Sequence, residues 1–343
     1  MCRSIACIVP PDLLQKLAAD ATAEEKRKLL ATLRQDRAMR QERKLAAMSL
    51  RPSAAVAGKG TGKPKRAIYD QGNVASDAPA KLVRKEGASA SKDPAVNEAY
   101  DGFGATFDFF YKLFGWDSID GAGLPLTGLV HYGAEYDNAF WNGRSMVFGD
   151  GDGKLFLRFT KSIDVIAHEL THGVTEHTLG LNYSGQSGAL NESVSDVFGS
   201  MVKQYAKKQT AAAADWLIGN DIVGPELAPA LRNMKAPGTA NKYDDQPADM
   251  NGYVKTRSDN GGVHTNSGIP NRAFALTSLA IGGNSWEGAG RIWWATLRDP
   301  VVKPTATFKQ FANSTVKQAG LLFGPTSAQS IAVKTAWQTV KVL

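Results

Sequence analysis

The apolar residues between positions 12 and 48 recur at the spacing of an amphipathic helix. They fall into two groups, Leu13, Leu14 and Leu17 and then Leu29, Leu30 and Leu33. We therefore predict one or two helices in this stretch. Residues 51–66 have no apolar period and are built of small, glycine, proline and basic residues, so we predict an exposed linker there.

The pattern changes after the linker. From Ala67 to about Phe159, short apolar runs (AIYD, LTGLVHYG, SMVFGDG and KLFLRF) alternate with Gly, Asp and Asn, which predicts strands and turns with one helix around Val96–Leu113. Helical periodicity dominates afterwards, in Ser162–Thr178 and then in NESVSDVFGSMVKQYAKK, HTNSGIPNRAFALTSLAI, GAGRIWWATLRD and TFKQFANSTVKQAG. The sequence thus predicts an α+β protein whose first half is β-rich and whose second half is helical.

These changes of pattern divide the chain. We expect a detachable leader at residues 1–50, a linker at 51–66 that is a preferred site of proteolytic nicking, and two larger domains. The β-rich domain spans residues 67–178 and the helical domain spans 179–343. With 343 residues and 43% hydrophobic content, the chain can bury a core of this size.

The net charge of +7 is concentrated in the leader and the linker. Residues 1–66 hold 15 Lys and Arg against 6 Asp and Glu, which leaves 25 against 27 for the remainder. A basic chain would ordinarily suggest a nucleic-acid partner. Because the charge lies on a detachable segment, we favour a solvated helix face that complements an acidic surface of the same molecule, and expect no nucleic-acid partner.

The sequence bears on the cellular compartment of the protein only through patterns that it does not contain. No apolar run is long enough to span a membrane, so no membrane partner is expected. The first residues show no pattern of a Sec-type signal peptide, which predicts synthesis in a bacterial-type cytoplasm and leaves secretion to another route. Both cysteines, Cys2 and Cys7, precede Pro10, so no disulfide is expected in the rest of the chain.

Candidate chemistry is concentrated in His168-Glu169-Leu170-Thr171-His172, in the middle of the predicted helix 162–178. Two histidines at i and i+4 project from one helix face, so both imidazoles can reach one metal ion. A carboxylate at Glu169 could take a proton from a metal-bound water. The pattern alone is a weak hypothesis of zinc hydrolysis, because five-residue patterns arise by chance.

A third ligand would strengthen the hypothesis. Glu192 lies twenty positions after His172 in the next predicted helix, and a helix-turn-helix of this length can fold it back onto the two histidines. Two His and one Glu would leave one zinc position for water. Asp196, one turn after Glu192, could accept the free ring N–H of a ligand histidine, and Asn191 is placed for a similar role.

With these motifs the sequence resembles the thermolysin-like zinc metalloproteases, and its short leader resembles the protealysin branch. The resemblance runs from about Ala67 to the end of the chain, and includes the blocks Asn138–Gly143, Met146–Gly153 and Asp259–Gly268. It implies a peptidase that cleaves peptide or protein substrates, a monomer, a zinc cleft between the two halves, and a leader that acts as a propeptide and inhibits in cis.

The resemblance also implies roles for individual residues. Glu169 would be the general base, His264 and Tyr183 would stabilise the oxyanion, and Asp259 would orient His264. Asn138 and Ala139 would hold the substrate backbone. Further substrate contacts would come from Arg232, which grips a carbonyl, and from an apolar pocket of Phe156, Val165, Ile218 and Leu231 that favours cleavage before large hydrophobic residues.

Calcium is where the sequence departs from the family. The family's double calcium site uses a cluster of carboxylates, of which Asp164 and Asp215 remain, while Lys203, Leu217 and Asn220 stand where oxygen ligands are expected. We therefore expect this calcium site to be lost. The positive charge of Lys203 would pair with the two remaining acids.

The leader poses a separate question. Paired prolines at Pro10-Pro11 force an extended chain that could lie in the substrate groove. Cys2 or Cys7 could then act as an inhibitory thiol ligand to zinc, or both could simply be small apolar residues that pack the leader.

Other interpretations compete with that of a thermolysin-like peptidase. A catalytically silent binding protein on the same fold conflicts with the presence of Glu169, His264 and Tyr183. A basic nucleic-acid-binding module fused to a hydrolase would show salt-dependent binding by residues 1–66. A metzincin site would need a third histidine where Thr178 stands.

Overall fold

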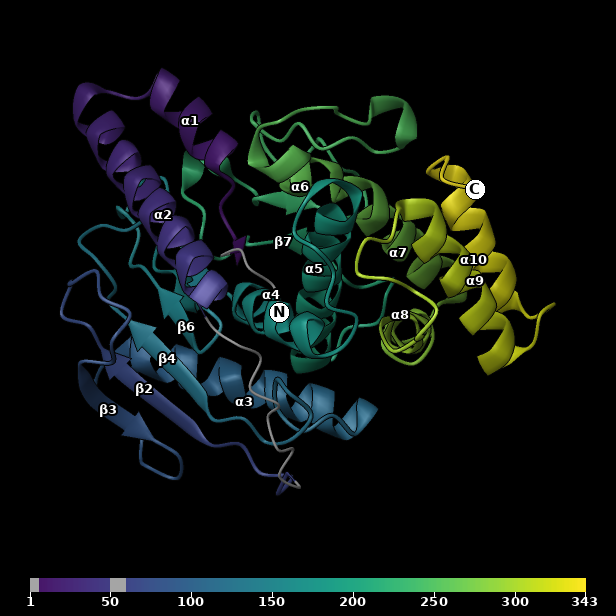
Figure 1. Cartoon of the computed structure of the whole chain (residues 1–343), viewed down its shortest axis with the longest axis horizontal. Helices are drawn as coiled ribbons and strands as arrows, with labels where there is room; N and C mark the ends of the chain where they lie inside the picture. The colour runs from purple at the N-terminus through teal and green to yellow at the C-terminus, as the bar shows by residue number, and fades with distance from the viewer. Residues whose placement is uncertain (1–5, 50–59) are drawn as a thin grey trace. The chain divides into compact units, whose positions relative to one another are not determined.

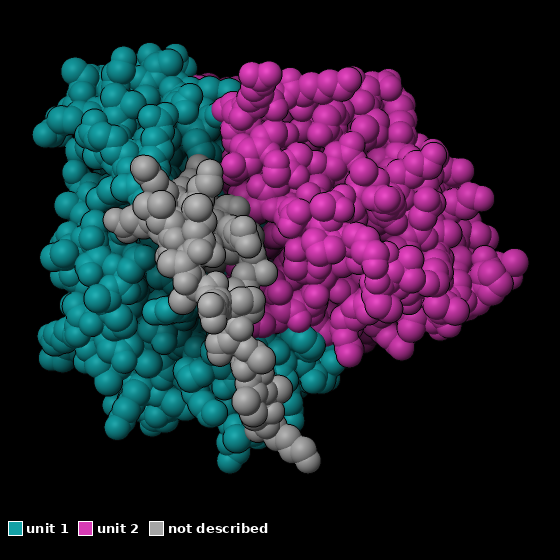
Figure 2. All heavy atoms as spheres, in the orientation of Figure 1, with its two compact units in different colours: residues 1, 3–174, 221–226 teal, residues 2, 175–220, 227–343 magenta. Residues whose placement is uncertain are grey.

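The computed structural model describes residues 6–49 and 60–343. The chain separates into two compact units, which Figure 2 colours individually. The first comprises Arg3–Val174 with Asp221–Glu226, and the second comprises Thr175–Asn220 with Leu227–Leu343. The described sheet of six strands belongs to the first half of the chain and most of the helices belong to the second, which confirms the predicted α+β class.

The first unit is organised by this six-stranded sheet, which has the order β1-β5-β6-β4-β2-β3. Its strands are β1 (Ala6–Cys7), β2 (Arg66–Asp70), β3 (Lys81–Lys85), β4 (Leu126–Val130), β5 (Ala139–Trp141) and β6 (Ser145–Phe148). Strands β2, β4 and β6 run parallel, and the other neighbours are antiparallel. Strands β5 and β6 are buried along their whole length, which explains their continuous apolar runs.

Helix α3 (Pro94–Phe114) packs along this sheet, as Figure 1 shows. It begins with Asp93, whose side chain accepts a hydrogen bond from the Ala95 N–H, and with Pro94, whose fixed φ suits the first helical turn. It ends at Gly115, which adopts the left-handed conformation (φ 63°).

The leader forms two helices that belong to the first unit, α1 (Pro11–Asp20) and α2 (Ala23–Ser49). Thr22 and Glu25 make the reciprocal hydrogen bonds of a capping box, which fixes the start of α2. Leu29 and Leu33 are buried as their periodicity predicts, whereas Leu30 is exposed. The leader therefore docks through one face of α2.

Helix α4 (Ile163–His177) follows a single 3-10 turn (Phe159–Lys161) and matches the helix predicted for residues 162–178. Almost every residue of its first three turns is buried, so the helix is surrounded by protein on all sides. The boundary of the two units falls after Val174, within this helix.

The second unit is built mainly of helices: α5 (Gly185–Lys207), α6 (Asp259–Asn266), α7 (Gly268–Ile281), α8 (Ala289–Leu297), α9 (Phe308–Phe323) and α10 (Ala328–Thr339). A two-stranded ladder, β7 (Leu217–Ile218) with β8 (Arg232–Asn233), and two 3-10 turns (Met250–Gly252, and Pro225–Leu227, where the chain passes from the first unit back to the second) complete the elements. Trp293 centres the helical core, with its ring 5.1 Å from Phe274 and 6.1 Å from Trp337.

Several sequence-based expectations needed correction. The run KLFLRF is not a strand: Phe156 makes only an isolated bridge to Val223. The Asp152 carboxylate instead accepts hydrogen bonds from the backbone N–H groups of Lys154, Leu155 and Phe156, which hold a turn. Helices α5 and α9 begin or end beyond their predicted bounds, and helix α10 and strand β3 were not predicted.

None of the helices in the described ranges is long and apolar enough to cross a membrane.

Candidate active site

The two histidines of α4 converge on one point. His168 and His172 are buried, their rings are nearly perpendicular (84°), and their Nε2 atoms lie 3.0 Å apart. Because the residues stand one helical turn apart, the helix itself sets this approach. Two imidazole nitrogens aimed at one point are the first half of a metal site.

Glu169 lies between the histidines in the sequence and is also buried. Its Oε2 accepts a hydrogen bond of 3.1 Å from the backbone N–H of Trp141, the last residue of β5. This bond fixes the carboxylate relative to strand β5.

Glu192 of α5 is surrounded by polar side chains of the second unit. The Tyr183 hydroxyl donates a short hydrogen bond to Glu192 Oε1, and His264 Nε2 lies 3.4 Å from Oε2. Tyr183 and His264 are themselves 3.3 Å apart, between the hydroxyl and Nε2. The structure therefore brings three of the predicted site residues together.

Asp259 holds the other side of the His264 ring. Its Oδ1 lies 2.8 Å from Nδ1, and its Oδ2 accepts the His264 backbone N–H at 2.8 Å. Burial alone would lower the pKa of His264, but the carboxylates of Asp259 and Glu192 raise it above its ordinary value. Because a carboxylate oxygen accepts at 2.8 Å from Nδ1, this nitrogen carries a proton, and Nε2 faces Tyr183.

The backbone around Asp259 makes this contact possible. Four successive residues, Asp259 to Gly262, have positive φ angles between 47° and 92°. Such a run folds the chain tightly enough for Asp259 to reach a residue five positions later. Glycine is required at Gly262, where a Cβ would approach Asn266 Nδ2 to 2.9 Å in addition to the unfavourable φ.

A metal-binding group of three residues is present in the described part of the chain. His168, His172 and Glu192 each offer one ligand atom, and these atoms all lie within 4.8 Å of one another. All three side chains are buried, and two imidazoles with one carboxylate match the donor set of a catalytic zinc site with one open position. The residues present therefore fit zinc.

Asp196 and Arg232 form a buried ion pair. The guanidinium donates two hydrogen bonds to the carboxylate, Nε to Oδ2 at 2.9 Å and Nη2 to Oδ1 at 2.8 Å. Asn271 donates a third bond to Asp196 at 2.8 Å. The Asn191 side chain donates a hydrogen bond to the Leu181 carbonyl at 3.1 Å.

Four apolar residues were expected to line a substrate pocket, and all four are buried. Ile218 pairs with Arg232 across the β7–β8 ladder and accepts a hydrogen bond from the Leu231 N–H at 3.0 Å. In the first unit, Phe156 stacks on Phe159, with their rings 5.7 Å apart. Val165 is buried in the first turn of α4.

The leader occupies the strand that was expected to hold substrate. Residues Ala6–Cys7 pair antiparallel with β5, and the Ile8 N–H donates to the Ala139 carbonyl at 3.2 Å. The Asn138 side chain accepts the Val9 N–H at 3.0 Å and donates to the Val9 carbonyl at 3.2 Å. Both predicted backbone-binding residues, Asn138 and Ala139, are thus engaged by the leader.

Cys7, which belongs to the leader, is buried in an apolar cluster. Its neighbours there include Met39 of α2 together with Tyr132, Tyr136 and Phe140. The described metal-binding group contains no cysteine. Cys2 lies outside the described residues.

Lys203 stands in the region where the family's calcium ligands were expected. Its buried ammonium lies 2.5 Å from the Leu217 carbonyl, 3.0 Å from Asp215 Oδ1 and 3.2 Å from Asn220 Oδ1. Three oxygens therefore surround one fixed positive charge. Asp164, in the first unit, accepts a short hydrogen bond from Ser162.

Sequence reasoning missed several polar residues of the site. Asp36 and Thr32 of α2 bond to the strand region around Asn138, and Asn271 bonds to Asp196. Asp36 carried a usable signal, because it lies on the apolar face of α2 that also presents Leu29 and Leu33. Asn271 had no such signal, since its partner is 75 residues away.

A His-Glu-x-x-His helix whose two histidines meet a glutamate from the next helix defines a metallopeptidase of the gluzincin type. Comparisons with known proteins establish the family. The thermolysin metallopeptidase catalytic domain matches residues 52–176, and the thermolysin metallopeptidase alpha-helical domain matches residues 179–342. The chain therefore belongs to the thermolysin family of metallopeptidases, and it is an enzyme that acts on peptide bonds.

Individual relatives place the chain within this family. It is 49% identical to an extracellular metalloprotease of Pectobacterium carotovorum, over 99% of this chain and 97% of that protein. It is 42% identical to the protease PrtS of a Photorhabdus species, over 92% and 87%. Among solved structures it matches the precursor of protealysin, a metalloproteinase from Serratia proteamaculans, with a TM-score of 0.88 and 46% identity over 98% and 100% of the two chains. The match to a precursor supports a protealysin-type enzyme with a propeptide.

Proposed function

We propose that the protein is a zinc endopeptidase, made as a zymogen, that cleaves peptide bonds before large hydrophobic residues. The observation that carries this proposal is the convergence of His168, His172 and Glu192, whose ligand atoms lie within 4.8 Å of one another. Zinc held by these residues supplies a Lewis acid that polarises a carbonyl and makes a coordinated water more acidic. The other site residues bind substrate and move protons.

Glu169 is the general base in this proposal. It is adjacent in sequence to one ligand, buried, and fixed by the Trp141 N–H. A carboxylate held in this way can accept a proton from the attacking water and return it to the leaving amine. The link to β5 places the base beside the strand that would bind substrate.

Tyr183 and His264 are the proposed oxyanion donors. Their contact at 3.3 Å brings the hydroxyl and Nε2 together, and Asp259 sets the orientation of the ring. Donors that are fixed before the reaction stabilise developing negative charge without reorganisation. Removal of one such donor typically lowers kcat by about 10²- to 10³-fold.

Substrate recognition uses the strand edge and the apolar residues. Asn138 and Ala139 offer side-chain and backbone groups along β5, which can pair with an extended peptide. Arg232 is fixed by Asp196 for a contact with a substrate carbonyl. The preference for large hydrophobic residues is assigned to Phe156, Val165, Ile218 and Leu231, since all four are apolar and buried.

The leader inhibits the enzyme in cis. It occupies the same strand edge and the same Asn138 side chain that substrate would need, so substrate and leader compete. Residues 1–50 are the propeptide, and cleavage within 51–66 releases domains 67–178 and 179–343 as the active enzyme. The surroundings of Cys7 favour a packing role for that residue. The name of the Pectobacterium relative supports an extracellular site of action.

A cation of the protein's own replaces calcium. The ammonium of Lys203 lies among three oxygens, from Asp215, Leu217 and Asn220, so it supplies a positive charge where the family's calcium ligands are expected. Pairing of Lys203 with Asp164 remains a prediction. The enzyme is proposed to act as a monomer without nucleic acid or membrane partners.

The test compares Glu169→Ala with wild type after an added protease has removed the leader from both, because the uncleaved precursor is inhibited. The variant should bind one zinc per chain, measured by elemental analysis, yet hydrolyse a chromogenic peptide with kcat reduced by at least about 10³-fold. Chelation with phenanthroline should abolish wild-type activity, and added zinc should restore it. A variant that keeps most of its activity, or an enzyme insensitive to chelation, would refute the mechanism.

A further inference from the structure

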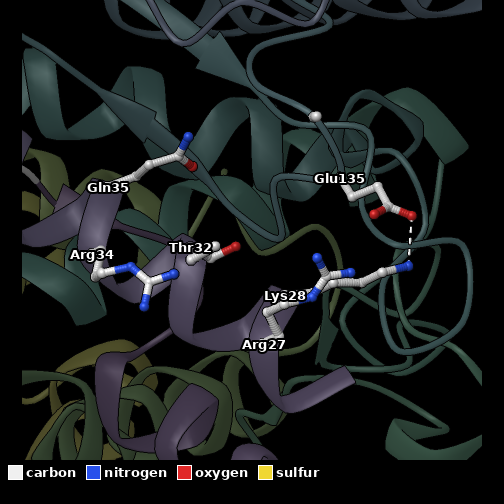
Figure 3. Close-up of a pocket in the computed structure, with 8 residues that line it drawn as sticks. Arg27, Lys28, Thr32, Arg34, Gln35 and Glu135 are labelled. Carbon is white, nitrogen blue, oxygen red and sulfur yellow. Dashed lines mark hydrogen bonds and ion pairs between the residues drawn. The ribbon is translucent and has the colours of Figure 1, made fainter. Parts of the chain in front are cut away.

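A cavity of about 300 Å³ lies between leader helix α2 and the loop that precedes β5. Figure 3 shows its polar lining, to which α2 contributes most of the side chains and the loop contributes Glu135. The labelled lining residues are Arg27, Lys28, Thr32, Arg34, Gln35 and Glu135. None of them belongs to the proposed catalytic or substrate-binding set, so the cavity is a separate feature.

The charge of this cavity is unbalanced. Lys28 and Glu135 form an ion pair at 2.7 Å, in which the two charges offset each other. Arg27 and Arg34 take part in none of the ion pairs or hydrogen bonds found within residues 6–49 and 60–343. Two guanidinium groups therefore give the cavity a net positive charge that no side chain of the described chain neutralises.

The positions of the two arginines are fixed by the helix. Residues seven apart lie two turns apart, about 10 Å along the axis and about 20° apart around it, so Arg27 and Arg34 flank the same stretch of surface. Figure 3 shows Thr32 between them. The Thr32 hydroxyl oxygen accepts the Asp137 N–H at 3.2 Å, and its own proton can be donated to a ligand.

We propose that this cavity binds a small ligand that carries two or more phosphate groups, with one group bound by Arg27 and another by Arg34. Guanidinium groups present paired N–H donors that match phosphate oxygens bidentately, and they stay charged at all physiological pH values. Two anionic groups on one short chain can engage both arginines at once, whereas a single phosphate reaches one. Thr32 and Gln35 also line the cavity and supply neutral donors.

Such a ligand would act on the zymogen. The cavity is made by α2 together with the loop at Ala134 and Glu135, so it is complete only while the leader is docked. A ligand that binds only the docked state shifts the equilibrium toward that state. Polyphosphate is therefore expected to stabilise the precursor and to slow the loss of the leader.

The rival explanation is diffuse attraction to a basic helix face. Lys26 and Arg37 are also exposed on α2, about 60 to 100° around the helix from Arg27 and Arg34, but they do not line the cavity. A general attraction would depend on all four cations alike. A built site would depend on the two that line the cavity.

The experiment compares two double variants that lose the same charge. Inorganic tripolyphosphate is titrated by calorimetry into the full-length chain, whose intact mass is checked before and after, at low salt. Arg27→Gln with Arg34→Gln should weaken binding by about tenfold, as expected for two exposed charge-assisted contacts. Lys26→Gln with Arg37→Gln should change affinity by less than about twofold, because these residues contribute only through screened long-range attraction.

The matched pair also controls for metal chelation by tripolyphosphate, which would be the same in both variants. All four residues are exposed and glutamine is a good helix former, so folding should persist; circular dichroism checks this. Equal weakening in the two variants would show diffuse attraction and overturn the site. Absence of binding to the wild-type precursor would overturn it as well.

Discussion

Asp36 of the leader and Asn138 of the substrate strand are joined by a buried hydrogen bond, from Asn138 Nδ2 to Asp36 Oδ2, of 3.0 Å. The other oxygen of Asp36 accepts the Tyr136 hydroxyl. The Asp36 carboxylate of α2 thus accepts hydrogen bonds from two side chains outside the leader, those of Tyr136 and Asn138. Asn138 also bonds both backbone groups of Val9, so a single network links the helix and the extended segment of the leader.

Replacement of Asp36 by alanine should loosen the leader. The change leaves the Tyr136 hydroxyl and one Asn138 N–H buried without this acceptor, and an unsatisfied buried donor costs about 1 to 3 kcal/mol. The uncleaved precursor should then hydrolyse a chromogenic peptide measurably, and the leader should be removed faster. Peptidase assays combined with intact-mass spectrometry over time measure both effects.

Glu24→Ala provides the matched control for this change. Glu24 is an exposed acid on the same helix, and its contact with Lys28 is long at 3.8 Å. Exposed pairs of this kind contribute about 0 to 1 kcal/mol, so the control should behave like wild type. An Asp36→Ala precursor as silent and as slowly processed as this control would show that the network does not hold the leader.

Two substitutions of Cys7 separate packing from zinc ligation. Cys7→Val keeps an apolar side chain in the cluster with Met39 and Phe140 but removes the thiol, whereas Cys7→Ser keeps a small side chain and adds an unfavourable buried hydroxyl. If Cys7 only packs, the valine precursor should stay silent and the serine precursor should have a lower melting temperature. Activity in the uncleaved valine precursor, assayed with the same chromogenic peptide, would instead identify the thiol as an inhibitory ligand.

The catalytic helices could be predicted because their signals are local. The spacing of His168 and His172 acts within one turn, and α4 forms within one residue of the predicted ends. Helix α3 likewise carries its apolar period and its end signals within the segment itself, and helix α8 carries its apolar period. The sequence was therefore sufficient to predict a helix where the signals for it lie within the helix itself.

Predictions from the sequence failed in two situations. In one, the bonding partner is distant in sequence; in the other, a side chain accepts the backbone N–H groups that a strand would use for pairing. The run KLFLRF alternates like a strand, but Asp152 captures its first N–H groups, and Leu157 bonds the Ile222 carbonyl 65 residues away. The docking of Asp36 on Asn138, across 102 residues, has no local signal that names the partner. The polar contacts that distinguish this precursor are therefore visible only in the folded chain.

His131 should make stability depend on pH. Its Nδ1 lies 2.8 Å from Asp150 and its Nε2 lies 2.8 Å from Asp93. The hydrogen bond to Asp150, opposed by burial and assisted by Asp93, raises the pKa of His131 to about 9. A raised histidine pKa gives stability that is fully present below the unfolded value near 6.5 and is lost as pH rises through 9.

The expected loss between pH 6.5 and 9.5 is about 2 kcal/mol of unfolding free energy, discounted because the side chain is partly exposed. Burial, together with the neighbouring Asp152, also raises the pKa of Asp137, to about 8, which changes stability in the same direction. The comparison is therefore between wild type and His131→Gln, in urea titrations at pH 6 and 9.5. The variant should show a clearly smaller decrease, and an equal decrease in both would remove His131 as the cause.

The surroundings of Lys203 allow a test of the prediction that calcium does not bind at this place. Its ammonium already sits 2.5 to 3.2 Å from the oxygens of Leu217, Asp215 and Asn220, so calcium would face a like charge at this place. A calcium-selective chelator, used with zinc present, should change the melting temperature of the wild-type chain by less than about 1 °C, which corresponds to a few tenths of a kcal/mol. A large decrease that calcium reverses would contradict the assignment.

The converse variant, Lys203→Glu, sharpens this test. A buried glutamate beside Asp215 leaves like charges without a cation, so the chain should be destabilised, and calcium should restore part of the loss because the new carboxylate completes an oxygen cluster. Lys207→Glu is the control, since it makes the same charge change on an exposed position of α5. Calcium should raise the melting temperature of the first variant and leave the second unchanged. If calcium rescues neither variant, the oxygens around Lys203 do not form a cation site.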